Sequence, residues 1–489
     1  MIAKWMNLKH AAGWLLSLHF LFWTGVAFTL DIHPDMADHW VWSRYLDWGY
    51  YEHPPMVAWM MRLITATVPA HPTVTLKLGS VAISTLILWL AYRVALSFFS
   101  RKTALLYILL LEAAPYFSIG SIFWHIDQPY MIFWLCGLLV LSKFVDSKNR
   151  QWILLFGVVA GLGAVSKYIM VLFYVGLAFW CFFDRRFRYL LTCWQSYCAG
   201  LISLLLFLPV ILWNAQRDWI SFRFQLGRGL SGMSHFGNLP ELTIGHLLIF
   251  SPIFTLLVWA LLFSKKLVVR PVSEKQSLLL ATGLLPFLFF SFSSLRGTIA
   301  DPHWLNVCYF SMFLLLAHRM DKAQTVSPSN SSYGIGFALA FGYNAILLAV
   351  ALLQVHYSLL PIPKEYDLSK KLIGWQRTAE QIEEVLAKEG IARLDYVVTR
   401  EYQLGGALAL YLKSMPLSHS IEKPERNSWS PVERVKRFRY ALFCPPPECD
   451  GTKRKAEKRL QKRFELLKTV KTAINGNPVR ELSVYLPQP

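Results

Sequence analysis

The sequence predicts a polytopic α-helical membrane protein of about eleven transmembrane helices, followed by a small soluble α/β domain. Hydrophobic residues make up 55% of the 489 residues and charged residues only 16%, and the mean hydropathy is +0.38. This composition is too apolar for a soluble protein of this length. Near residue 355 the composition changes to charged and turn-forming residues. We therefore expect a multi-span domain at 1–355 and a soluble α/β domain at 356–489.

Each predicted span is an apolar window close to the length of about 20 residues that crosses a bilayer. The windows are 11–30, 76–98, 103–122, 129–145, 152–166, 168–183, 190–213, 243–264, 277–293, 304–318 and 333–354. The windows 152–166 and 168–183 are both short, and Lys167 lies between them. They are either two tilted helices or one broken unit.

Basic residues predict the orientation, because they fall in alternate short loops, which face the cytoplasm. They are Lys4, Lys9, Arg101, Lys102, Lys148, Arg150, Arg185, Arg186, Arg188, Lys265, Lys266, Arg270, Arg319 and Lys322. The N-terminus is then cytoplasmic, and the first loop and the soluble domain lie on the outer side. The start MIAKWMNLKH resembles a retained anchor without a cleavage site. Part of the net charge of +19 thus comes from basic loops that set the membrane orientation and contact anionic lipids. We therefore expect no nucleic-acid partner.

The soluble domain shows helix and strand patterns. GWQRTAEQIEEVLAKEG and LGGALALYL predict helices, LDYVVTR and YALFCP predict strands, and ELLKTVKTAI with VRELSVYL predicts a hairpin around Asn475, Gly476 and Asn477. The basic stretch KRKAEKRLQKR is interpreted as a solvated helix face. Cys444 and Cys449 in CPPPEC favour a local disulfide over a metal site, because no His or further Cys lies nearby.

The outer loop after the first span is crowded with polar side chains. It reads DMADHW and then WSRYLDWGYYEHPPM, and such crowding at a bilayer surface indicates bound substrate and chemistry. Asp38 and His39 follow Asp35 by three and four residues, so in a helix all three side chains would lie on one side. The alternative is that Asp35 is an N-cap. Glu52 and His53 precede two prolines that fix their backbone, and surface exposure is the alternative for both.

Further polar residues fall on the same predicted side. The turn SIFWHIDQPYMIFW holds His125 and Asp127 between apolar helices, where a carboxylate is costly unless it has a partner or lies in water at the headgroups. Lys167 either snorkels to headgroups or holds a phosphate. Two more outer loops carry Arg217, Asp218, Arg223, Arg228, Arg296, Asp301 and His303, and lipid-surface anchoring is their alternative role. Together these groups suit a phosphate leaving group and an attacking hydroxyl.

In order along the chain, these motifs resemble the bacterial branch of the GT-C superfamily of membrane glycosyltransferases, of the family 39/83 type. This type is related to protein O-mannosyltransferases and to the aminoarabinose transferase of lipid A. The resemblance rests on VWSRYLDWGYYEHPPMVAW within 35–62, the turn at 127–129, SKY at 166–168 and LWNAQRDWISFRFQ at 212–225. It covers essentially the whole chain and implies a GT-C fold in a bacterial inner membrane with a periplasmic C-terminal domain.

The resemblance implies a transferase that moves a sugar from a polyprenyl-phosphate-linked donor to lipid A, another glycolipid or a protein, by inverting displacement. It implies that Asp35 is the base or orients the acceptor, and that Asp127 is the second catalytic acid. The candidates beside the donor phosphate are Glu52, His53, Lys167, Arg217, Arg296 and His303, with Asp38, His39 and His125 as supporting residues. No cofactor is certain; for a divalent metal, Glu52 and His303 are the candidate ligands.

One position departs from the family pattern, which usually reads Asp-Glu-Ala where this chain has Met36 in second place. Either Asp35 acts alone, or Asp38 substitutes for the missing acid, or the substrate has changed or activity is lost. A non-catalytic scaffold therefore stays open as an alternative function. A lipid or ion transporter is the other alternative, and it predicts inverted repeats that the sequence lacks. Nucleotide-binding fingerprints are also lacking, which favours a lipid-linked donor.

Overall fold

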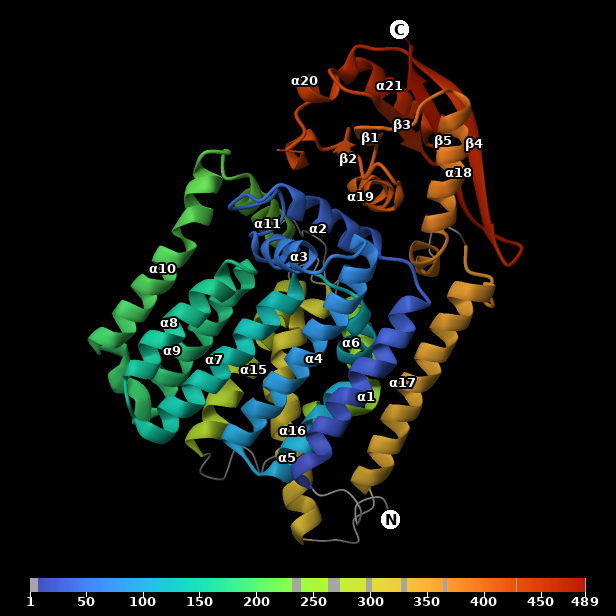
Figure 1. The fold of residues 1–489 in the computed structure, drawn as a ribbon. Coiled ribbons are helices and arrows are strands. Elements are labelled where there is room, and N and C mark those ends of the chain that lie inside the picture. The colour runs from blue at the N-terminus through green and yellow to red at the C-terminus, as the bar shows by residue number, and fades with distance from the viewer. Residues whose placement is uncertain are drawn as a thin grey trace.

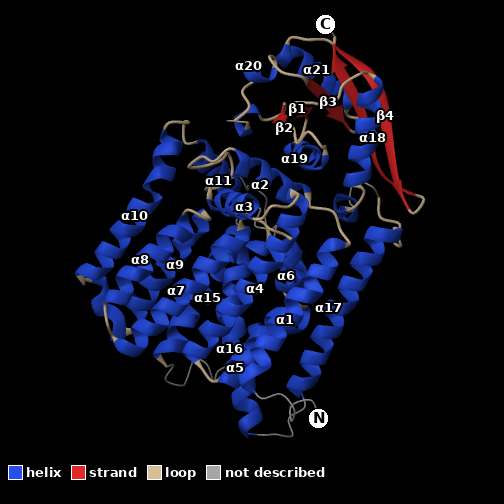
Figure 2. Ribbon diagram, in the orientation of Figure 1, coloured by secondary structure: helices blue, strands red, loops and turns tan. Residues whose placement is uncertain are grey.

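A computed structural model describes residues 8–230, 239–262, 273–295, 301–326, 332–363, 367–427 and 429–488. Long helices form a bundle, and a mixed α/β unit lies across one end of it (Figures 1 and 2). The bundle helices are α1 (Leu8–Phe28), α4 (Pro72–Phe98), α5 (Arg101–Glu112), α6 (Pro115–Ser118), α7 (Asp127–Ser147), α8 (Gln151–Ala164), α9 (Val171–Phe183), α10 (Trp194–Ala215), α12 (Leu239–Ile249), α13 (Pro252–Leu262), α15 (Glu274–Leu295), α16 (Asn306–Val326) and α17 (Ser332–Tyr357).

Shorter helices connect the bundle. Three α-helices lie near the end that meets the α/β unit, α2 (Pro34–Arg44), α3 (Met56–Thr67) and α11 (Ile220–Leu230). The 3-10 helices are η2 (Ile119–Ile122), η3 (Tyr168–Met170), η4 (Arg185–Leu191), η5 (Pro302–Leu305), η6 (Leu368–Leu372) and η7 (Pro424–Arg426).

Within the described ranges, six helices are long and apolar enough to cross a membrane, or up to eight if each of two bent pairs is one span. The pair α5–α6 bends by 84° after Glu112, and the pair α12–α13 bends by 110°. Every predicted window overlaps a helix, which confirms a polytopic helical membrane protein. The count of about eleven stays a prediction, because α8 and α9 are shorter than a full span.

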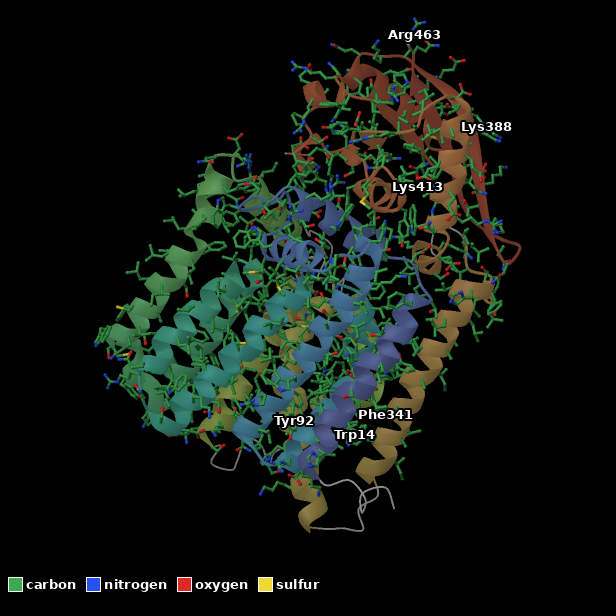
Figure 3. The ribbon with its side chains drawn as sticks, in the orientation of Figure 1. Trp14, Tyr92, Phe341, Lys388, Lys413 and Arg463 are labelled. Atoms are coloured by element: carbon green, nitrogen blue, oxygen red, sulfur yellow. A yellow bond between two sulfur atoms is a disulfide. The ribbon has the colours of Figure 1, made fainter. Side chains whose placement is uncertain are left out.

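Side chains on the outside of the bundle fit a lipid environment. Trp14 on α1 is 63% exposed and Phe341 on α17 is 38% exposed, whereas the side chains labelled on the α/β unit are the charged Lys388, Lys413 and Arg463 (Figure 3). Large apolar groups exposed to water would be unfavourable. The surface of the bundle therefore suits a bilayer, and the soluble character of the α/β unit stays a prediction.

The α/β unit contains one five-stranded sheet in the order β2-β1-β3-β5-β4. Strand β1 is parallel to β2 and β3, whereas β5 is antiparallel to β3 and β4. Its elements are α18 (Trp375–Lys388), β1 (Tyr396–Thr399), α19 (Tyr402–Tyr411), β2 (Leu417–Ser420), α20 (Val432–Val435), β3 (Tyr440–Cys444), α21 (Cys449–Leu460), β4 (Phe464–Ile474) and β5 (Asn477–Pro487). The predicted helices, strands and hairpin lie at these positions, and β2 is an element the sequence reading missed. The domain boundary at 355/356 stays a prediction and falls in the last turn of α17.

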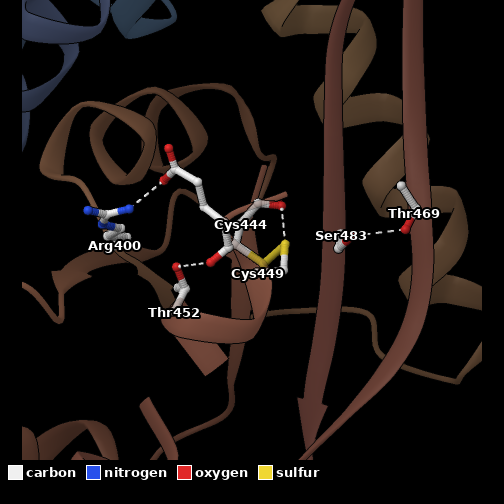
Figure 4. Close-up of a disulfide and its surroundings, with 7 residues drawn as sticks. Arg400, Cys444, Cys449, Thr452, Thr469 and Ser483 are labelled. Carbon is white, nitrogen blue, oxygen red and sulfur yellow. Dashed lines mark hydrogen bonds and ion pairs between the residues drawn. A yellow bond between two sulfur atoms is a disulfide. The ribbon is translucent and has the colours of Figure 1, made fainter. Parts of the chain in front are cut away.

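Cys444 and Cys449 are joined by a disulfide at the start of α21, with their Cα atoms 5.3 Å apart (Figure 4). Glu448 beside it accepts hydrogen bonds from Arg400 Nη1 (2.8 Å) to its carboxylate and from Thr452 Oγ1 (2.9 Å) to its carbonyl. The other five cysteines are free thiols.

A thiol titration of the denatured, unreduced protein is therefore expected to count five reactive cysteines, rising to seven after reduction, because two of the seven cysteines form this bond. A count of seven before reduction, on protein purified from an oxidising compartment, would contradict the disulfide.

Candidate active site

The loop after the first span folds into α2 and α3, which lie between the bundle and α19 (Figure 1). Pro34 at the first position of α2 suits a helix start, because its missing N–H would have no partner there. The N-cap is His33, whose Nδ1 accepts a hydrogen bond from the backbone N–H of Asp35 (3.2 Å). The alternative in which Asp35 is the N-cap is therefore wrong. Its side chain, in the first turn, is available for other contacts.

Asp35 is held at the boundary between the bundle and the α/β unit. Its Oδ1 accepts a hydrogen bond from Gln403 Nε2 on α19 (2.7 Å), and its Oδ2 lies 3.6 Å from His33 Nδ1. Burial alone would raise the pKa of this carboxyl, but the nearby imidazoles of His33 and His125 and the bond from Gln403 outweigh burial and lower the pKa. Asp35 is therefore a carboxylate at neutral pH and can accept a proton.

Asp127 begins α7 and is almost completely buried, at 3% exposure. Its Oδ1 accepts a hydrogen bond from Lys167 Nζ, and the two form a buried ion pair. Its Oδ2 accepts a hydrogen bond from Tyr116 Oη (3.1 Å), and Asn306 Nδ2 donates in turn to that hydroxyl (2.8 Å). The two predicted residues thus satisfy each other, which meets the condition for a carboxylate at membrane depth. Lys167 does not snorkel to the surface.

Histidines connect the two aspartates. The rings of His39 and His125 lie 5.0 Å apart, those of His125 and His303 lie 6.4 Å apart, and His303 Nε2 is 3.8 Å from Asp127 Oδ2. Burial lowers the pKa of His39 to about 3 and that of His303 to about 4. The imidazoles of His39 and His303 are therefore neutral at pH 7, and each can donate one ring N–H to an anionic group.

A cavity of about 560 Å³ runs from this cluster into the bundle. Its polar end includes Asp35, His125, Asp127 and His303. Its walls are apolar and come from α4, α5, α6, α17 and η6, including Ile87, Leu88, Leu111, Phe117, Leu347, Ala351, Leu368 and Leu372. Polar lining residues next to mainly apolar walls suit an amphipathic ligand with a charged headgroup and a hydrocarbon chain.

Met36 lies in the wall of this cavity, where its sulfur contacts the backbone N–H of Trp124 (3.4 Å). Asp38 does not line the cavity. It is 2% exposed and borders a small hollow with Arg426 and Trp429. Burial, together with the nearby Glu52 carboxylate, raises the pKa of Asp38 well above its usual range. Asp38 is therefore not placed to substitute for an acid at position 36.

Glu52 and His53 lie beside the cluster, and both make specific contacts. Glu52 forms an ion pair with Arg426 of the α/β unit, whose guanidinium stacks over the ring of Tyr402 (3.6 Å). Gln225 Nε2 donates to the Glu52 carbonyl (2.6 Å). Burial, with the nearby charge of Lys167, lowers the pKa of His53 well below its usual range.

The basic candidate Arg217 is not joined to this centre. Arg217 pairs with Asp47 (3.2 Å) and stacks over Trp213 (4.5 Å). Arg296 lies outside the described residues. The proposed metal ligands also fit poorly, because Glu52 is neutralised by Arg426 and His303 faces Asp127. Across the described ranges, no group of three or more His, Cys, Asp or Glu side chains is placed to hold a metal ion.

The sequence reading missed several residues at this centre. Gln403 and Arg426 lie 368 and 374 positions from their partners Asp35 and Glu52, so no local pattern indicates them. Tyr116 and Asn306 were missed because they lie within or next to apolar windows. His33 was missed although it lies two residues before the DMADHW motif, and a helix beginning with Pro34 is the signal that points to it.

Gly406 sets the spacing between α19 and α2. A Cβ at this position would lie 2.7 Å from the backbone nitrogen and 2.8 Å from the Cα of Asp38. Gly406→Ala is therefore expected to lower the free energy of unfolding by about 1–3 kcal/mol through overpacking, measured by thermal unfolding in detergent. Gly451→Ala on α21 is the matched control, because a Cβ there meets nothing within 4 Å. Equal melting temperatures for the two variants would show that the contact does not constrain the fold.

Comparisons with known proteins concern the fold. The family model described as dolichyl-phosphate-mannose-protein mannosyltransferase matches residues 52–213. The structure superposes on ArnT from Cupriavidus metallidurans bound to undecaprenyl phosphate with a TM-score of 0.63 at 16% identity, over 97% of this chain and 98% of ArnT. The protein has the GT-C fold of membrane glycosyltransferases.

Two further similarities extend this result. The oligosaccharyltransferase of Archaeoglobus fulgidus, tethered to an acceptor peptide, shares the GT-C fold with a TM-score of 0.53 at 13% identity, over 97% of this chain and 74% of that one. A lipid A galacturonosyltransferase, RgtD of Rhizobium johnstonii, is 25% identical over 238 residues, which are 45% of this chain. That match spans about half the length of RgtD (49%).

Proposed function

We propose that this GT-C protein transfers a sugar from a polyprenyl-phosphate-linked donor to an envelope glycolipid or protein. The observation that carries the proposal is the apolar cavity that ends at Asp35, Asp127 and a group of histidines. The family match over 52–213 and the similarity to a lipid A galacturonosyltransferase support this chemistry. A lipid or ion transporter predicts inverted repeats, which the sequence lacks.

The reaction is a single displacement. The isoprenoid chain lies among α4, α5 and α17, and the donor phosphate lies beside His125 and His303. Asp35 Oδ2 takes the proton of the acceptor hydroxyl as its oxygen bonds to the anomeric carbon, the bond from that carbon to the phosphate oxygen breaks, and polyprenyl phosphate leaves. The sugar is then attached with inverted configuration. A ring N–H of His125 stabilises the charge that develops on the phosphate.

Asp127 and Lys167 hold this end of the site rigid, and the ammonium adds positive charge near the leaving phosphate. Glu52 and His53 lie behind them and fix the start of α3. Arg217, which is bound to Asp47, we place at the lipid surface, and it takes no part in the displacement.

A second apolar cavity favours a lipid acceptor. It measures about 610 Å³ and lies among α9, α10 and α11, where Tyr168 and Gln225 line it. Gln225 also contacts Glu52 and lies 3.5 Å from His53 Nδ1. Hydrocarbon chains of a glycolipid acceptor fit this chamber, whereas a polar peptide does not.

The distribution of charge supports a proposed orientation in the membrane. Lys148 and Arg150, after α7, lie over the rings of Phe187 and Tyr189 of η4, the helix that carries Arg185, Arg186 and Arg188. Basic loops face the cytoplasm. We therefore place the protein in the bacterial inner membrane, with the N-terminus in the cytoplasm and the α/β unit in the periplasm.

The test compares a deletion strain, the complemented strain and the parent strain by mass spectrometry of lipid A, other glycolipids and envelope proteins. We expect one glycoconjugate to lose a single sugar in the deletion strain and to regain it on complementation. An unchanged set of envelope glycoconjugates would overturn the proposed function.

A further inference from the structure

Asp35, the proposed base, receives a hydrogen bond from a residue of the α/β unit. Gln403 lies in the first turn of α19, and its Nε2 donates to Asp35 Oδ1 at 2.7 Å. We propose that Gln403 is the positioning residue for Asp35, so that the α/β unit completes the active site of the membrane-embedded bundle. This inference rests on the proposed function, because it concerns how the base of that reaction is held.

Close packing fixes the position of Gln403. Gly406, one turn further along α19, faces α2, where a Cβ would meet the backbone of Asp38. Gly405 faces the sheet, where a Cβ would lie 2.9 Å from Thr399 Oγ1 and 3.0 Å from Ser418 Cβ. Helix α19 is therefore packed closely on both sides. This packing fixes the position from which the Gln403 amide donates to Asp35 Oδ1.

Further bonds join the same two units without touching Asp35. Tyr411, at the end of α19, accepts a hydrogen bond from the backbone N–H of Ile32 (2.6 Å). Arg44 Nη1 donates to the carbonyls of Met415 (2.8 Å) and Pro416 (3.1 Å). These contacts hold the units together, so the Gln403 bond can be removed without separating them.

The surroundings of Asp35 give the bond a chemical role. The titratable groups around it are His33, His39 and Asp38 from α2 and its N-cap, His125 from the segment before α7, and Tyr402 from α19. Gln403 is neutral and donates to the carboxylate form, which lowers the pKa of Asp35. It occupies Oδ1 and so leaves Oδ2 to take the acceptor proton.

The test is the pH dependence of two measurements on the purified full-length protein. The first is kcat/KM for transfer from a polyprenyl-phosphate-linked sugar. The second is modification of Asp35 by a water-soluble carbodiimide, read by peptide mass spectrometry; carbodiimides attack the protonated carboxyl, and this readout requires no activity. The variants are Gln403→Ala, which removes the donor, and Gln403→Glu, which keeps the size but places a negative charge beside Asp35.

We expect Gln403→Ala to move the acidic limb of kcat/KM and the midpoint of carbodiimide modification upward by about one pH unit. Gln403→Glu should move both further, because a neighbouring negative charge disfavours the carboxylate. At high pH, where Asp35 is ionised in every variant, kcat should recover to within a few-fold of the wild-type value. Gln376→Ala, which removes an exposed amide of α18 in the same unit, should leave both curves unchanged.

A loss of activity that is equal at all pH values, with an unshifted modification midpoint, would show that Gln403 only stabilises the interface and would overturn the inference. If one variant fails to fold, the shift in the other decides the question. Failure of the proposed function gives a different result, in which the wild-type protein transfers no sugar while the modification midpoint still reports the contact.

Discussion

Asp35→Asn is expected to lower kcat for sugar transfer by at least about 100-fold. An amide has no free carboxylate to take the proton of the acceptor hydroxyl, so the attacking oxygen stays a weak nucleophile. The fold should be retained, because the carbonyl oxygen of asparagine can still accept the hydrogen bond that Gln403 donates to Asp35. The measurement is single-turnover transfer with the purified protein in detergent, and KM for the donor should change little.

Asp218→Asn is the matched control for this experiment. Asp218 is an exposed carboxylate outside the cavity, in a backbone conformation with φ of 52° that asparagine tolerates. Its substitution makes the same chemical change and should leave kcat unaltered. If Asp35→Asn transfers sugar at the rate of this control, another group is the base.

Lys167→Met is expected to lower the free energy of unfolding by about 3–5 kcal/mol. The substitution keeps the length of the side chain but removes the cation that balances the Asp127 carboxylate in an almost fully buried pair. The variant should melt at a clearly lower temperature in detergent. Adding Asp127→Asn should recover much of this loss, because the uncompensated charge is then gone, yet sugar transfer should remain low.

Lys148→Met provides the comparison for an exposed pair. Lys148 and Glu274 lie 2.5 Å apart, with side chains 47% and 31% exposed, and such pairs contribute about 0–1 kcal/mol. Equal destabilisation by Lys148→Met and Lys167→Met would contradict the view that burial makes the Asp127 pair indispensable.

Hydrophobic windows predicted the bundle well, because the bilayer forces each spanning backbone into a helix that satisfies its own hydrogen bonds. The windows did not reveal the bends. The sharp turn after Glu112 directs the chain toward the turn at His125, and it results from Pro115 and from packing among helices that are distant in sequence.

At the site, residue types and order indicated Asp35, Asp127, Lys167 and His303. Ionisable side chains at the ends of apolar spans are costly to bury, so they usually have a functional role. Sequence could not show that Arg217 points elsewhere, since its choice of Asp47 depends on how α10 and α11 are oriented.

The contribution of the α/β unit was also not predictable. A glutamine in a short apolar helix carries no signal of its own, and Gln403 acquires its role only because Gly405 and Gly406 let α19 approach both neighbours. Close approach of two distant segments is a property of the assembled fold.

Helix α17 has a kinetic consequence for a lipid-linked donor. Leu347 and Ala351 face the cavity, whereas Leu339 and Ile346 on the same helix are 58% and 67% exposed, so a single helix separates much of the chamber from the bilayer. An isoprenoid donor that enters beside such a helix never dissolves in water. The turnover rate should then follow the mole fraction of donor in the membrane or micelle. Diluting the donor with inert lipid at constant bulk concentration should slow the enzyme as effectively as removing substrate.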